Sequence, residues 1–188
     1  MNILERYGVR GEDKESLHPL LAVIGIREVS QAIDNAIAPH SMPFYQLIYV
    51  DEGELEWWVD GRFYHLSKGD IILVKPYETQ GSLQGKIPTG RRYFMQINLY
   101  NEHVDEGLSS AERHSVNKLF KDFIPRILSM GNSFRQPFLR ILAAQRKVNE
   151  FSSITVKSGL LEIFNSLFCA QRDYLQNADI AHDDALQL

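Results

Sequence analysis

The chain has 188 residues, which is enough for one sizeable domain but not for several independent hydrophobic cores. Hydrophobic residues make up 44% of the sequence and charged residues 23%, so the composition excludes a disordered, collagenous or low-complexity chain. The formal net charge of −4 argues against a chain that holds nucleic acid through its own basic surface.

The cysteine content and the N-terminal sequence exclude further classes. The single cysteine, Cys169, rules out an intramolecular disulfide and any multi-cysteine metal site. Charged residues interrupt the first 20 residues, so we find no signal peptide there, and no other stretch approaches transmembrane length. We therefore expect a cytoplasmic protein that does not contact a membrane.

Residues 21–105 contain short apolar runs separated by Gly, Pro and Asp, a pattern typical of an all-β sandwich or barrel. The runs that predict strands are 21–26, 44–50, 54–59, 62–66, 71–75 and 92–99. Asp60-Gly61 is the clearest turn, because both residues can take the positive φ angles of a type I′ hairpin. Pairing outward from this turn sets Trp57 opposite Tyr64 on a mainly apolar face that should point into the barrel.

Helical spacing replaces the strand pattern after residue 105. The periodicity predicts helices over 109–124, 136–149 and 153–175. The third helix carries the longest apolar stripe, which must be covered by other parts of the protein. The barrel can cover it, another chain can cover it, or the barrel can cover one face and another chain the other. We expect this stripe to support homodimerisation, through Val156, Leu160, Ile163, Phe164, Leu167 and Phe168. Residues 176–188 have no Lys or Arg and no sustained helical period, which indicates a linker or frayed tail.

Part of the sequence resembles a cupin domain, and more narrowly the N-terminal effector-sensing cupin of AraC-type transcription regulators. The resemblance covers roughly residues 20–100 and is carried by the segments 40–53, 59–61 and 66–80, including Gly69-Asp70 and Pro76. It implies a mainly β fold, in which a cupin barrel (a double-stranded β-helix or jelly roll) is followed by C-terminal dimerisation helices. A small closed barrel of this kind holds either its own side chains or one small ligand.

The resemblance also implies a domain organisation. We expect an N-terminal arm over 1–20, an effector-binding barrel over 21–105, a helical dimerisation segment over 106–175 and a tail over 176–188. In AraC-type regulators a separate C-terminal domain with two helix-turn-helix units holds the DNA. The residues after 175 have neither the length nor the positive charge for such a domain, so we expect this chain alone to be either part of a longer regulator or a stand-alone sensor.

Metal-binding cupins carry a His-x-His pair, a Glu a few residues later and a further His. The matching positions here are His40, Met42, Gln46 and Gln80. A thioether and two amides are poor ligands for catalytic iron, manganese or zinc, so we expect no metal and no other cofactor. Neutral groups that both donate and accept hydrogen bonds suit a polyol or sugar instead.

Alternation along the strands and comparison with the family identify candidate ligand-binding residues. They are His40, Gln46, Glu52, Trp57, Gln80, Arg92, Phe94 and Gln96. Purely structural roles stay open for three of these residues. Trp57 can be a core aromatic, Glu52 can be a solvated acidic residue of a loop, and Arg92 can be a polar residue flanking an apolar strand. The favoured function is a small-molecule sensor, with a sugar as effector. The alternative is a metal-free cupin isomerase or lyase acting on a carbohydrate, with His40 as general base and Glu52 or Glu78 beside it.

Overall fold

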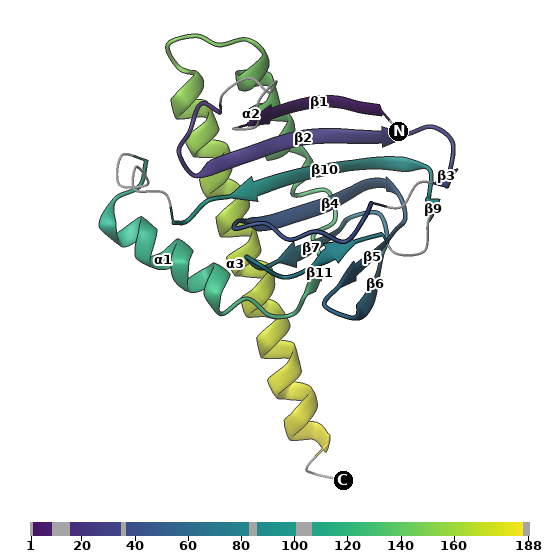
Figure 1. Cartoon of the computed structure of the whole chain (residues 1–188). Coiled ribbons are helices and arrows are strands. Elements are labelled where there is room, and N and C mark those ends of the chain that lie inside the picture. Colours follow the sequence, from purple (N-terminus) through teal and green to yellow (C-terminus); the bar gives the residue numbers. More distant parts are fainter. Residues whose placement is uncertain (1, 9–15, 35–36, 83–85, 101–106, 186–188) are drawn as a thin grey trace.

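The computed structural model describes residues 2–8, 16–34, 37–82, 86–100 and 107–185. Antiparallel strands fill the first part of the chain and helices follow (Figure 1). The strands are β1 (Asn2–Gly8), β2 (Leu21–Val29), β3 (Ile33–Asp34), β4 (Tyr45–Gly53), β5 (Leu55–Val59), β6 (Arg62–Leu66), β7 (Asp70–Val74), β8 (Gln80–Gly81), β9 (Lys86–Ile87), β10 (Gly90–Ile97) and β11 (Ile127–Ser129). The fold is mainly β, with helices at the C-terminal end, as the sequence predicts.

The strands form a large sheet, a smaller one and a two-stranded pair. The strand order is β1-β2-β10-β4-β7-β11 in the large sheet, β6-β5-β8 in the smaller one and β3-β9 in the pair. Two of the large sheet's strands were not predicted. β1 lies within the expected N-terminal arm and pairs with β2, and β11 follows the first helix and pairs with β7.

The hairpin of β5 and β6 forms around the predicted turn. Asp60 and Gly61 have φ angles of 43° and 84°, the positive values that a type I′ turn needs. Oδ1 of Asp60 also accepts a hydrogen bond from the Thr79 backbone N–H at 2.9 Å. The register sets Trp57 opposite Tyr64, as predicted. Trp57 is consequently buried against the inner face of the large sheet.

Alternate residues of the large sheet face two different layers, because side chains along a strand point to opposite sides. One set packs against the helices and includes Tyr45, Leu47 and Tyr49 of β4 and Tyr93, Met95 and Ile97 of β10. The other set faces the smaller sheet and includes Ile48 and Val50 of β4, which belong to one cluster with Leu55 and Trp57 of β5. The large sheet is therefore the middle layer between helices and the smaller sheet.

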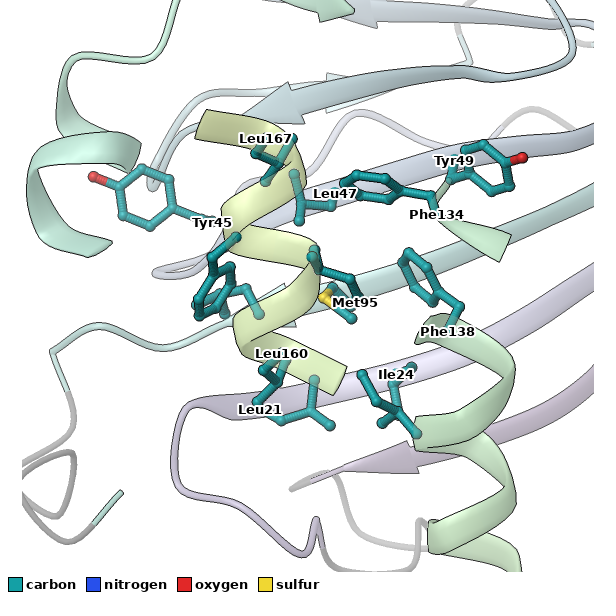
Figure 2. Packing of buried hydrophobic residues seen from close by; sticks show 14 of the residues in the cluster. Leu21, Ile24, Tyr45, Leu47, Tyr49, Met95, Phe134, Phe138, Leu160 and Leu167 are labelled. Carbon is teal, nitrogen blue, oxygen red and sulfur yellow. The ribbon is translucent and has the colours of Figure 1, made fainter. Parts of the chain in front are cut away.

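The helices are α1 (Ser110–Lys121), α2 (Arg135–Arg146) and α3 (Ser152–Ala185), close to the three predicted segments. A capping box begins α1, in which the Ser109 hydroxyl accepts from the Glu112 backbone N–H and the Glu112 carboxylate accepts from that of Ser109. On α2 and in the turn before it, Phe138 and Phe134 pack against Tyr49 of the sheet, with ring centroids 6.5 and 6.0 Å away (Figure 2).

The apolar stripe of α3 is largely part of this same core, which corrects the expectation that it forms the dimer contact. Five of its six residues are at most 4% exposed and pack within the helix-facing core, namely Val156, Leu160, Ile163, Phe164 and Leu167. Leu160 and Leu167 are seen against the sheet in Figure 2. Only Phe168, at 53% exposed, remains available to a second chain. The stripe is covered within this chain, because α3 packs against both the large sheet and α2.

The α3 helix also continues past the point where the sequence predicts a tail. Its backbone stays helical to Ala185 and extends away from the sheet (Figure 1). Residues 172–178 are exposed, so no packing enforces the helix there. Residues 172–185 contain no Gly or Pro, the two residues that most strongly disfavour a helix, but they also lack an apolar face that repeats at helical spacing. Hydrophobic periodicity misses such a solvated extension.

The predicted boundary near residue 105 lies outside the described residues. The helix-facing core draws on both sides of it, from strands and helices alike. Among the described residues, none of the helices has the length and apolar character needed to cross a membrane.

Candidate functional site

A cavity of about 250 Å³ lies on the side of the large sheet away from the helices. Its walls come from β1, β2, β4, β5, β9 and β10 and from the segment between β3 and β4. The polar lining residues are Arg6, Arg27, His40, Gln46, Arg92 and Gln96. Trp57 and Phe94 add aromatic surface, and aliphatic side chains complete the wall. A concave pocket with a few converging polar groups is the usual form of a small-molecule site.

Three glutamines and Trp57 form a chain of hydrogen bonds in this region. Gln96 lies opposite Gln46 in the β10–β4 register, and its Nε2 donates to Gln46 Oε1 at 3.3 Å. Gln46 Nε2 donates to Gln80 Oε1 at 3.2 Å, and Trp57 Nε1 donates to the same oxygen at 3.0 Å. Gln80 is fully buried behind the lining, so it orients Gln46 and Trp57 from outside the cavity wall.

This chain of hydrogen bonds leaves two amide atoms of its glutamines without a partner. Within the described part of the chain, Gln96 Oε1 and Gln80 Nε2 are buried without a partner. A buried amide atom of this kind costs free energy unless a ligand or an ordered water satisfies it. The Gln96 oxygen belongs to a lining residue and can accept from a hydroxyl group in the cavity.

Arg92 combines a structural contact with free donors. One of its terminal nitrogens, Nη2, donates to the backbone carbonyls of Glu54 and Pro88, the latter at 3.0 Å, and so joins two loops. Its Nε and Nη1 are buried and have no partner among the described residues. Burial, and then repulsion from Arg27, lower the pKa of Arg92 to about 10, so the side chain stays protonated at neutral pH.

Arg27 lies directly opposite Arg92 in the β2–β10 register. Its guanidinium carbon is 5.7 Å from the centre of the Phe94 ring, a cation–π distance. Burial, followed by repulsion from Arg6, lowers the pKa of Arg27. Its Nε is buried, and the structure shows no described partner for it.

His40 lies on the cavity wall next to Gln80. Its backbone pairs with Gln80 in an isolated bridge, and its Nδ1 is 2.9 Å from the carbonyl oxygen of Ala38. A ring held by a backbone carbonyl keeps its other nitrogen available for a hydrogen bond.

Glu52 does not reach the cavity, contrary to the expectation from strand alternation. The β4–β10 pairing contains a bulge, because Arg91 is opposite Glu52 but Arg92 is opposite Val50. The extra residue, Asp51, shifts the alternation of side chains, so Glu52 no longer points to the same face as Ile48 and Val50. Glu52 pairs with Arg91 instead, and its side chain is 55% exposed.

The residues at the cupin metal positions do not fit a catalytic metal. His40, Met42 and Gln46 line the cavity, but the Gln46 and Gln80 amides hydrogen-bond each other. Among the described residues, no group of three or more His, Cys, Asp or Glu side chains gathers in a way that could hold a metal ion. One imidazole, one thioether and two engaged amides are a weak donor set for iron, manganese or zinc.

The structure brings seven of the eight predicted ligand-binding residues together: six on the cavity wall and Gln80 behind it. Their contact with a ligand stays a prediction. Sequence reasoning missed Arg6 and Arg27. The predicted strand ended at residue 26, and one more step of the alternation from Val23 and Gly25 would have set Arg27 on the cavity face. Nothing local marks Arg6, because its place depends on the pairing of β1 with β2.

The layered barrel and its polar cavity define the class as a cupin-type domain. The chain belongs to the family of AraC-like ligand binding domains, whose model matches residues 26–163. This match agrees with the resemblance seen in the sequence. A search of curated proteins found no match.

Solved cupin structures are also similar to parts of this chain. An RmlC-like cupin from Shewanella frigidimarina is 26% identical over 42% of this chain, with a TM-score of 0.33. The Clostridium difficile EutQ protein is 22% identical over 42%, with a TM-score of 0.33, and a cupin 2 conserved barrel domain protein from Leptotrichia buccalis is 17% identical over 50%, with a TM-score of 0.37. The matches cover 67%, 57% and 40% of those three structures.

Proposed function

We propose that this chain is the effector-sensing and dimerisation module of an AraC-type transcription regulator in the cytoplasm. The observation that carries the proposal is the cavity between the two sheets, whose lining includes buried polar atoms that no described residue satisfies. A domain whose interior was only a packing core would fill this space with apolar side chains. In this proposal DNA contact belongs to a separate C-terminal helix-turn-helix domain.

The effector we favour is a hydroxylated small molecule of the carbohydrate type. Gln46 and Gln96 carry amides that can both donate to and accept from hydroxyl groups. The Trp57 side chain offers an apolar surface on which the carbon face of a sugar ring can lie, and its N–H is already satisfied by Gln80. Amide and aromatic groups together are suited to a ring that has both hydroxyl edges and an apolar face.

The geometry argues against the enzymatic alternative. Neither carboxylate that was expected to assist His40 lines the cavity. Glu52 pairs with Arg91, and Glu78 binds Arg126, whose Nη2 lies 2.7 Å from Glu78 Oε1. Burial raises the pKa of Glu78, but hydrogen bonds from Arg126 and the Lys75 backbone N–H outweigh it and lower the pKa overall. Glu78 is therefore a poor proton acceptor at neutral pH.

The dimerisation surface we propose is the groove between α1 and α3. Two adjoining hollows run along it and share Ser115, Leu119 and Phe168. Ile124 and Leu175 extend the same apolar surface, and they are 53% and 37% exposed. Exposed apolar side chains grouped between two helices are typical of a surface that a second chain covers.

A thermal-shift screen tests the sensing function. The purified chain is heated with neutral sugars, sugar acids, sugar phosphates and other small metabolites, and each stabilising compound is recovered and analysed for conversion. We expect one compound class to raise the melting temperature and to be recovered unchanged. Conversion to product would favour the enzyme, and stabilisation by nothing would contradict the sensing function.

The variant Gln46→Leu tests whether the stabilising compound binds in the cavity. This change removes the central amide of the hydrogen-bond chain, so we expect it to abolish the thermal shift. Gln31→Leu changes an exposed glutamine outside the cavity and should leave the shift intact.

A further inference from the structure

Positive charge is concentrated on one wall of the cavity. Arg6, Arg27 and Arg92 come from β1, β2 and β10, which are neighbours in the large sheet. Arg27 and Arg92 are paired in register across β2 and β10. Like charges directly opposite each other in a sheet destabilise the pairing. The whole chain has a net charge of −4, so this local excess of cations runs against the overall charge.

No described residue that lines the cavity offers a carboxylate to Arg27 or Arg92. Arg27 Nε, Arg92 Nε and Arg92 Nη1 are buried N–H donors without a partner in the described chain. Buried cations with unpaired donors are costly unless a counter-charge reaches them. The Phe94 ring stacks on the flat face of the Arg27 guanidinium and accepts no hydrogen bond from its Nε.

We propose that the effector carries an oxyanion, a carboxylate or a phosphate, which binds between Arg27 and Arg92 at the β2–β10 side of the cavity. Guanidinium groups bind such anions through short, charge-assisted and often paired hydrogen bonds. The Gln46 and Gln96 amides then take hydroxyl groups on the rest of the molecule. This inference rests on the proposed sensing function and narrows its ligand from a sugar in general to an acidic sugar derivative or a similar hydroxylated anion.

Anion binding is tested first with inorganic phosphate and with acetate, each titrated against the whole chain at constant ionic strength set with sodium chloride. We expect at least one of them to raise the melting temperature saturably, by about 3 °C or more. Arg27→Gln should remove this rise. Arg62→Gln is the matched control, because Arg62 is an exposed arginine of β6 outside the cavity, and it should leave the rise unchanged.

The second arm compares D-glucose, D-glucuronate and D-glucose 6-phosphate, which share a ring and differ in charge. A shift with glucuronate but not with the phosphate assigns a carboxylate ligand, and the reverse assigns a phosphate. A shift with glucose alone, equal in Arg27→Gln and Arg62→Gln, would overturn the anion site but keep the sensing function. Anion stabilisation that survives Arg27→Gln would also overturn it. If no compound of either arm shifts the melting temperature, the result would count against both the anion site and the sensing function.

Discussion

His18 is a buried titratable side chain away from the cavity. It is 4% exposed, and its Nδ1 accepts a hydrogen bond from the Leu20 backbone N–H at 3.3 Å. Burial, assisted by repulsion from Lys157, lowers the pKa of His18 from 6.5 to about 4, although a backbone hydrogen bond with Gly107 acts in the other direction. The folded protein therefore holds this imidazole neutral.

This depressed pKa predicts a pH dependence of stability. Between pH 6.5 and pH 4 the unfolded chain binds a proton at His18 that the folded chain excludes, so stability falls as the pH falls through this window. From these two pKa values we expect His18 to cost about 2 kcal/mol of unfolding free energy at pH 5 relative to pH 7.5.

Urea unfolding at both pH values measures this effect. His18→Asn keeps an acceptor for the Leu20 N–H, and its unfolding free energy should fall by about 2 kcal/mol less than that of the wild type between pH 7.5 and pH 5. His65→Asn changes an exposed histidine of the hairpin and should keep the full pH dependence. Equal pH dependence in wild type and His18→Asn would show that His18 titrates normally.

Residue by residue, the cavity was predictable where alternation held. The hairpin pairing set Trp57 on the inner face, and alternation combined with the family resemblance did so for Gln46, Arg92, Phe94 and Gln96. The structure finds all of them on the cavity wall. Two-residue periodicity cannot reveal which residues of other strands complete the wall. That information depends on strand order, which brings β1, β2 and β10 together from distant parts of the chain.

At the scale of elements, the bulge in β4 is both the feature that misled the sequence analysis and a stabilising contact. Asp51, its extra residue, is 3% exposed and lies beneath α2. Its carboxylate is 2.8 Å from Arg91 Nε and 3.1 Å from Arg135 Nε, and it accepts a hydrogen bond from the Tyr93 hydroxyl at 3.3 Å. This cluster ties β4, β10 and α2 together.

Removal of the Asp51 charge should weaken that junction. Asp51→Asn loses two ion pairs with partly exposed arginines, and we expect a loss of about 3 kcal/mol of unfolding free energy. Glu162→Gln removes an exposed ion pair with Arg140 and should change stability by less than about 1 kcal/mol. Denaturant unfolding at pH 7.5 compares them, and equal small losses would refute a structural role for Asp51.

The helices show what apolar periodicity can and cannot predict. It located α1, α2 and α3, because each has one face that must be buried. It could not tell which surface covers the stripe of α3, since a sheet and a second chain satisfy the same pattern. It also missed the continuation of α3 to Ala185, because residues 172–178 are exposed and carry no apolar face that periodicity could detect.

At the scale of the whole molecule, the proposed α1–α3 groove predicts a homodimer with Phe168 near its centre. Phe168→Glu should convert the dimer to a monomer, because it sets a charge in an apolar interface. Phe63→Glu changes a similarly exposed phenylalanine on the hairpin and should leave the dimer intact. Sedimentation equilibrium measures the mass of each variant. A monomeric wild type, or a Phe168→Glu dimer as tight as the wild type, would contradict the groove as the interface.

The central claim is that a small molecule binds in the cavity between the two sheets, and Trp57 provides the most direct measurement of it. The chain has two tryptophans, and only Trp57 lines the cavity, while Trp58 alternates to the other face of β5. In Trp58→Phe, the fluorescence of Trp57 should change saturably as a stabilising compound is added, with the same midpoint as the thermal shift. In Trp57→Phe, the signal of Trp58 should stay constant. A compound that stabilises the protein without changing Trp57 fluorescence would show that it binds elsewhere and would contradict the account.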